Sequence, residues 1–143
     1  MNKLIISILF LCLISCKQDN INGIEIGITL LEHQSLDDNK KLVTLIEGTL
    51  KGDYKALSQL NLFPCGGGEG CYDKGFIITQ IIYKMGEDDF VKIVDKLAQD
   101  ELIGMKDCIR AGLEYGDNDK DGKIDNKALE KEFPMLMKKL SKK

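Results

Sequence analysis

The stretch FIITQIIYKMGEDDFVKIVDKL, residues 76–97, predicts most clearly how this chain folds. Its apolar residues recur every three or four positions on both sides of Gly86, which is the spacing of one buried face of an α-helix. Three acidic residues follow Gly86 directly, and the helix dipole favours negative charge in a first turn. The stretch therefore predicts two consecutive amphipathic helices that are separated at Gly86.

The same helical spacing continues on both sides of this stretch. Ser35 and Asp53 have the positions of N-caps, a further apolar stripe runs through Leu113, and Pro134 should break the C-terminal helix. Residues 24–31 alternate like a strand and then become continuously apolar, so helix or irregular packing is only slightly favoured there. We predict an all-α fold in which residues 24–143 form one domain of five to seven short helices.

Composition narrows the class of function. The chain has 143 residues, 43% of them hydrophobic, with 20 Lys and Arg against 23 Asp and Glu and a formal charge of -3. This charge argues against nucleic-acid binding through a basic surface, so no nucleic-acid partner is expected. The chain contains a single histidine, His33. We expect it to be a surface or capping residue, because no nucleophile is near it in the sequence.

The N-terminus has the layout of an export signal. Lys3 precedes an apolar run that ends in Leu13-Ile14-Ser15-Cys16. This ending resembles the lipobox of bacterial lipoproteins, in which the cysteine receives diacylglycerol, the preceding peptide is removed, and the new amine is usually acylated, for example with palmitate. The resemblance implies a signal peptide over residues 1–15, a lipid on Cys16 and a polar tether over residues 16–23. A plain signal peptide or an anchor helix is the alternative.

A lipidated Cys16 would anchor the protein without spanning the membrane. The expected location is the cell envelope, on the outer membrane or facing the periplasm rather than the cytoplasm.

A second resemblance lies near the C-terminus, where residues 117–129 read DNDKDGKIDNKAL. This stretch resembles the calcium loop of the EF-hand family, with Gly122 at the position of the sharp turn and Ile124 at the apolar position. Calcium prefers several hard oxygen ligands that one tight loop can supply. An EF-hand-like unit is therefore expected over residues 105–140. The expected ligands are Asp117, Asp119, Asp121 and Asp125 through their side chains and Lys123 through its backbone carbonyl.

The loop departs from the family at its last position, where Ala128 replaces the glutamate that binds calcium with two oxygens. Glu132 could reach the ion only through a water molecule, and Glu130 is expected to point elsewhere. The sequence has no second loop of this type. We therefore expect a weak calcium site that braces two helices rather than a sensor. A solvated acidic turn without an ion is the alternative.

Cys65 and Cys71 enclose a glycine-rich loop, and an exported protein meets an oxidising compartment. We expect a disulfide between them and a buried or free thiol at Cys108. Pairing of Cys108 with one of the other two cysteines stays open.

No catalytic constellation emerges from the sequence, so we expect no enzymatic activity. The favoured function is a lipid-anchored envelope protein that binds calcium and acts as a binding or structural module, and a protein partner in the envelope is a candidate. One alternative is an immunity or inhibitor protein that neutralises a secreted toxin or enzyme, by analogy of size, compartment and helix content. Another is an enzyme that uses the cysteine loop or the calcium site, which would require a cleft that joins the glycine-rich loop, His33 and carboxylates.

Overall fold

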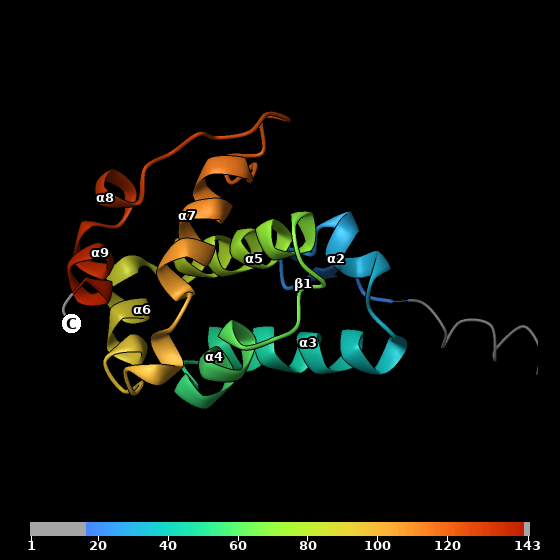
Figure 1. Cartoon of the computed structure of the whole chain (residues 1–143), viewed down its shortest axis with the longest axis horizontal. Coiled ribbons are helices and arrows are strands. Elements are labelled where there is room, and N and C mark those ends of the chain that lie inside the picture. Colours follow the sequence, from blue (N-terminus) through green and yellow to red (C-terminus); the bar gives the residue numbers. More distant parts are fainter. Residues whose placement is uncertain (1–16, 142–143) are drawn as a thin grey trace, which may run out of the picture.

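The computed structural model describes residues 17–141, and these residues form a mostly helical fold (Figure 1). The expectation of a helical domain is confirmed, but the count of five to seven is too low, because the described residues contain eight α-helices. In chain order the elements are β1 (Asn20–Ile21), β2 (Ile24–Glu25), α2 (Ile28–Glu32), α3 (Leu36–Leu50), α4 (Tyr54–Asn61), α5 (Glu69–Met85), α6 (Glu87–Val94), the 3-10 helix η2 (Asp100–Leu102), α7 (Met105–Tyr115), α8 (Leu129–Glu132) and α9 (Pro134–Leu140).

Several helix ends lie where the sequence predicts them. Ser35 and Asp38 form a reciprocal capping box at the start of α3, and the Asp53 side chain accepts a hydrogen bond from the N–H of Lys55 at the start of α4. Gly86 separates α5 from α6, where its φ of +87° suits a residue without a side chain. Pro134 begins α9 and so divides the C-terminal helix into two.

Helix α5 runs through the middle of the fold, with α3 and α4 on one side and α7 on the other (Figure 1). It approaches α7 most closely where Gly75 meets Gly112. A Cβ atom on Gly75 would lie 2.1 Å from the carbonyl oxygen of Cys108, and one on Gly112 would lie 2.2 Å from that of Gly75. Both positions therefore require glycine, and the two backbones touch without intervening side chains.

The core forms around the stretch that predicts the helices. Ile77, Ile78, Ile81 and Ile82 of α5 are fully buried, and Phe90 of α6 joins them. The four isoleucines contact the buried stripes of the surrounding helices in one continuous cluster. The predicted helical face is thus the buried face, as hydrophobic burial requires.

The N-terminal segment is more ordered than a polar tether. The backbone N–H of Gln18 donates to Asn39 Oδ1 at 2.7 Å, and Asn39 Nδ2 donates to the Gln18 carbonyl at 2.8 Å. Ile21 pairs with Ile24 in the small sheet and is 4% exposed. Residues 17–23 of the predicted polar tether therefore supply hydrogen bonds and apolar surface to the domain.

Residues 24–31 combine both conformations that their pattern allows. Ile24 and Glu25 form a strand, paired with residues before them in the chain rather than with a downstream partner, and Ile28 begins helix α2. Within residues 17–141, no helix has both the length and the apolar character needed to cross a membrane. The predicted signal peptide and Cys16 lie outside the described residues.

Candidate metal centre

The acidic loop connects α7 to the single turn of α8. Asp117 organises its first half, since its two carboxylate oxygens accept the N–H groups of Asp121 and Gly122, both at 2.9 Å. Gly122 has a φ of +82°, which is the left-handed region expected at the sharp turn. The first half of the loop thus folds back around its first aspartate.

Three of the four predicted acidic side chains converge. Asp117, Asp119 and Asp125 each offer an oxygen, and these oxygens lie within 4.8 Å of one another. Asp121 is not part of this group, because its side chain accepts the N–H of Lys123 at 2.9 Å. Lys123 is held at the turn by that bond, and its ammonium lies 3.8 Å from Asp121. Three carboxylates in such proximity can hold a divalent cation.

Asp125 is the least exposed of these acids, with a side chain that is 1% exposed. Its Oδ2 accepts the backbone N–H of Asn118 at 2.8 Å and the side-chain amide of the same residue at 2.7 Å. Its Oδ1 is buried and has no hydrogen-bond donor other than the Lys127 ammonium, which lies 3.2 Å away as an ion pair. Burial alone would raise the pKa of Asp125, but the bonds from Asn118 and the charge of Lys127 outweigh burial and hold the pKa below its usual value.

Lys127 neutralises part of this charge. Its ammonium lies 3.2 Å from Asp125 and 3.5 Å from Asp119, and it stands 5.7 Å from the centre of the Tyr83 ring. Burial alone would lower the pKa of Lys127, but the two carboxylates raise it above its usual value. A bound cation would therefore compete with the Lys127 ammonium for the carboxylates of Asp119 and Asp125.

Asn118 ties the loop to the core. In addition to its bonds with Asp125, its side-chain amide donates to the carbonyl of Gly112 at 3.0 Å, and its Oδ1 accepts the hydroxyl of Thr79 at 2.8 Å. Neither Asn118 nor Lys127 is identified from the sequence. Nothing in the local pattern predicts these contacts, because Asn118 makes them with α5 and α7.

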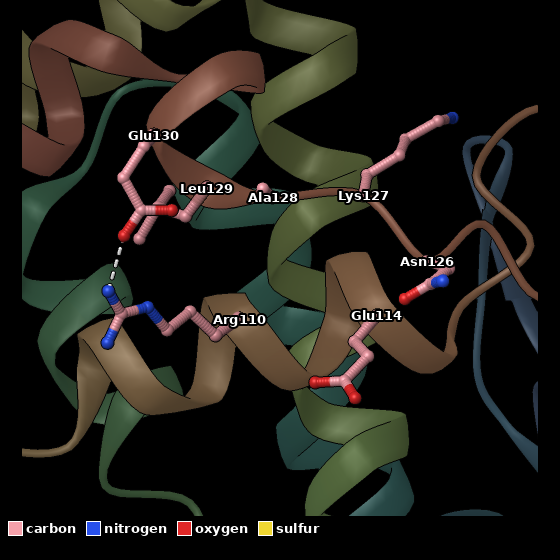
Figure 2. A pocket seen from close by; sticks show the side chains of 7 residues that line it. All are labelled: Arg110, Glu114, Asn126, Lys127, Ala128, Leu129 and Glu130. Atoms are coloured by element: carbon pink, nitrogen blue, oxygen red, sulfur yellow. Dashed lines mark hydrogen bonds and ion pairs between the residues drawn. The ribbon is translucent and has the colours of Figure 1, made fainter.

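No nearby glutamate replaces the missing last ligand at Ala128. Figure 2 shows Ala128 in the wall of a hollow between α7 and the start of α8, with Glu130 turned toward Arg110. Glu130 forms an ion pair with Arg110, as the dashed line indicates. Glu132 accepts a hydrogen bond from the Tyr83 hydroxyl at 2.7 Å. The expectation that Glu130 points elsewhere is confirmed, and Glu132 is engaged outside the loop.

The flanks agree with the EF-hand pattern only in part. The entering helix buries Ile109 and Leu113, the exiting helix buries Leu129, and Phe133 directly after it is buried as well. However, α8 begins only at Leu129 and spans 4 residues, and Ile124 is 65% exposed. The described residues thus form a helix–loop–helix with a short exiting helix and an unpaired loop, and they do not establish the EF-hand fold.

The cysteine prediction is confirmed, because Cys65 and Cys71 form a disulfide and Cys108 is a free thiol. Burial raises the pKa of Cys108. All three cysteines line one shallow hollow beside Tyr72. The alternative pairing of Cys108 is thus not found.

A second hollow brings His33 and Asp38 together with Cys65 and Gly66. These are the groups that the enzyme alternative requires in one cleft. However, Cys65 is held in a disulfide, and the Asp38 carboxylate accepts both the N–H and the hydroxyl of Ser35. His33 is exposed, and its Nδ1 lies 2.7 Å from the carbonyl oxygen of Thr29. The residues lining this hollow provide no free thiol that His33 could activate.

No protein-family model, no curated protein and no solved structure matches the chain. Its function is therefore inferred from its own residues.

Proposed function

We propose that this protein is a lipid-anchored protein of the cell envelope whose C-terminal loop binds calcium and thereby braces the helices on either side of it. The observation that carries the calcium proposal is the convergence of Asp117, Asp119 and Asp125 within 4.8 Å. The side chain of Asp125 is almost fully buried, and its Oδ1 already lies 3.2 Å from the positive charge of Lys127. A cation between the three carboxylates would compete with Lys127 for Asp125 and Asp119 and would neutralise more of the cluster's charge.

The donor set favours calcium over softer metals. All candidate ligands are oxygens, and the group includes neither thiolate nor imidazole. Without a bidentate glutamate at Ala128, the site provides fewer ligands than calcium prefers, so water must complete the coordination. An affinity in the range of about 10⁻⁴–10⁻³ M is typical of extracellular calcium modules.

Contacts from the loop to other elements support a bracing role. Lys120 forms an ion pair with Glu25 of β2 at 3.1 Å, and Asn118 bonds to α5 and α7. A calcium ion that orders the loop would therefore stabilise contacts with elements far away in the sequence. The expected response to calcium is a higher unfolding temperature rather than a change of fold.

Calorimetric titration and thermal unfolding test this proposal. We expect millimolar calcium to bind and to raise the unfolding temperature, and we expect Asp117→Asn and Asp125→Asn to remove both effects. Asp88→Asn is the matched control, because Asp88 is exposed on α6 and its replacement changes the net charge equally. If the unsubstituted protein shows no heat of binding and no thermal shift at millimolar calcium, the calcium proposal is refuted.

Metabolic labelling tests the lipid anchor separately. In cells that process lipoproteins, labelled palmitate should be incorporated into the full-length chain and should be lost with Cys16→Ala. Cys12→Ala is the control, because Cys12 precedes the expected cleavage point and its replacement should leave labelling intact. Equal labelling of the two variants would contradict the assignment of Cys16.

A second candidate function is the binding of a protein partner, which includes the inhibitor alternative. Tyr72 and Tyr115 are 43% and 47% exposed and stack with ring centres 4.7 Å apart, beside the Cys65–Cys71 disulfide. Exposed aromatic side chains held by rigid surroundings are typical of protein interfaces.

Pull-down from envelope extracts with and without chelator tests the binding of a protein partner. A partner should be captured by the native protein and lost with Tyr115→Ser, whereas identical lists for both would refute a role for this surface.

A further inference from the structure

The N-terminal residues that follow Cys16 are held against the domain rather than free. The two hydrogen bonds between Gln18 and Asn39 tie the chain to α3, and the Lys17 ammonium donates to the carbonyl of Leu31 at 2.7 Å. The carbonyl of Asp19 accepts the N–H of Ile26 at 2.7 Å. From Lys17 onward, each residue up to the first strand thus has a contact with the domain.

This arrangement limits the distance between the domain and a lipid on Cys16. An extended chain spans at most about 3.6 Å per residue, so Cys16 can lie no more than about 7 Å from Gln18. The eight-residue tether expected from the sequence would instead reach about 29 Å. A lipid on Cys16 would therefore hold the domain at the membrane surface and not at the end of a flexible linker.

We propose that the surface around Lys17, formed by α2 and the first turn of α3, rests on the lipid bilayer. We call it the anchor face. This inference rests on the proposed lipidation of Cys16. In Figure 1 the chain enters the domain at the end where α2 and the beginning of α3 lie.

The anchor face carries exposed apolar side chains. Ile28, the first residue of α2, is 74% exposed and lines one hollow with Asp19 and Leu31. Leu36, the first residue of α3, is 42% exposed and lies one turn before Asn39, which binds Gln18. Apolar side chains of this kind gain free energy by entering the boundary between head groups and acyl chains.

Charges at the anchor face indicate which lipids suit it. Asp19 and Asp37 are exposed there, but Lys40 lies 3.7 Å from Asp37, and Lys17 keeps its charge while it donates to the Leu31 carbonyl. These two acids and two lysines balance one another, which suits zwitterionic head groups.

A chemically anchored form of the protein tests this orientation without depending on lipidation in cells. The chain from Cys16 onward, with Cys108→Ala so that Cys16 is the single free thiol, is coupled to a maleimide lipid in phosphatidylcholine vesicles. The chain contains no tryptophan, so Ile28→Trp, Leu36→Trp and Ile103→Trp each introduce one reporter. Ile103 is the control, because it is 72% exposed and follows η2, which packs against α4.

A nitroxide on the lipid head group then quenches tryptophan that lies near the bilayer. We expect quenching at positions 28 and 36 to reduce fluorescence about twofold, with little change at position 103, because only the anchor face lies at head-group depth. A flexible eight-residue insert between Cys16 and Lys17 should abolish the difference. Equal quenching at all three positions, or none at 28 and 36, would overturn the proposal.

The two proposals fail in distinguishable ways. If the unsubstituted chain takes up no labelled palmitate, the natural anchor is refuted, and the orientation of the coupled protein stays as measured. Normal labelling combined with position-independent quenching would refute the anchor face and would leave lipidation intact.

Discussion

Replacement of Lys127 by methionine should strengthen calcium binding. The Lys127 ammonium lies 3.2 Å from Asp125 and 3.5 Å from Asp119, two of the three acids that converge in the loop. It therefore acts as an internal cation that a calcium ion must displace or tolerate. Methionine has a similar shape without the charge, so it removes this competition and keeps much of the packing.

The size of the effect follows from the geometry. Calcium lies about 2.5 Å from a carboxylate oxygen. Because the ammonium is 3.2 Å from Asp125, the two cations would be no more than about 6 Å apart. At the dielectric constant of water, charges of +2 and +1 at that separation repel by about 1.4 kcal/mol, which is about tenfold in affinity. Movement of the flexible lysine away from the ion would reduce this figure.

Calorimetric titration at low ionic strength measures the effect. Lys123→Met is the matched control, since it removes the same charge from the same loop. The Lys123 ammonium lies 3.8 Å from Asp121, outside the convergent group, and its side chain is 81% exposed. We expect Lys127→Met to bind calcium several times more tightly than Lys123→Met. Equal affinities, or weaker binding by Lys127→Met, would refute the argument that Lys127 competes with the ion.

Three further predictions concern the scaffold. Replacement of both Cys65 and Cys71 by serine should destabilise the domain by about 2 kcal/mol, because the short loop loses its cross-link. Denaturant unfolding measures this loss, and an unchanged midpoint would contradict the prediction. Gly112→Ala should destabilise the domain by about 2 kcal/mol or more, because the new Cβ meets the Gly75 carbonyl at 2.2 Å. A near-native unfolding temperature would show that α5 and α7 can separate at little cost. Maleimide should modify Cys108 at least about tenfold more slowly in the native protein than in urea, because burial raises its pKa and blocks access; equal rates would mean that the thiol is exposed.

The amino-acid pattern predicts much of the secondary structure because its signals are local. The capping box at Ser35, the cap at Asp53 and the break at Pro134 depend on residues within one turn of each other. The disulfide between Cys65 and Cys71 is local as well, because it closes a loop of sequence separation 6. The buried stripe of α5 follows from a 3.6-residue period.

Other features depend on contacts between distant segments. The segment at residues 17–23 looks polar, yet Gln18 is held by Asn39, which lies 21 residues away. The two short strands form because Asn20 and Glu25 meet across a turn, and the side chain of Gln80 bonds to Glu25 from α5. No local pattern could predict these contacts, because their partners become neighbours only after the helices pack.

The amino-acid pattern alone indicates that the protein is helical, places several helix ends, and shows four aspartates in one loop around a turn glycine. Which of these acids converge depends on the packed fold. It brings Asp117, Asp119 and Asp125 together, turns Asp121 toward Lys123, and places Lys127 against the group. The physical reason is that Asn118 fixes Asp125 while it bonds to α5 and α7, so the arrangement of charges depends on how the helices pack.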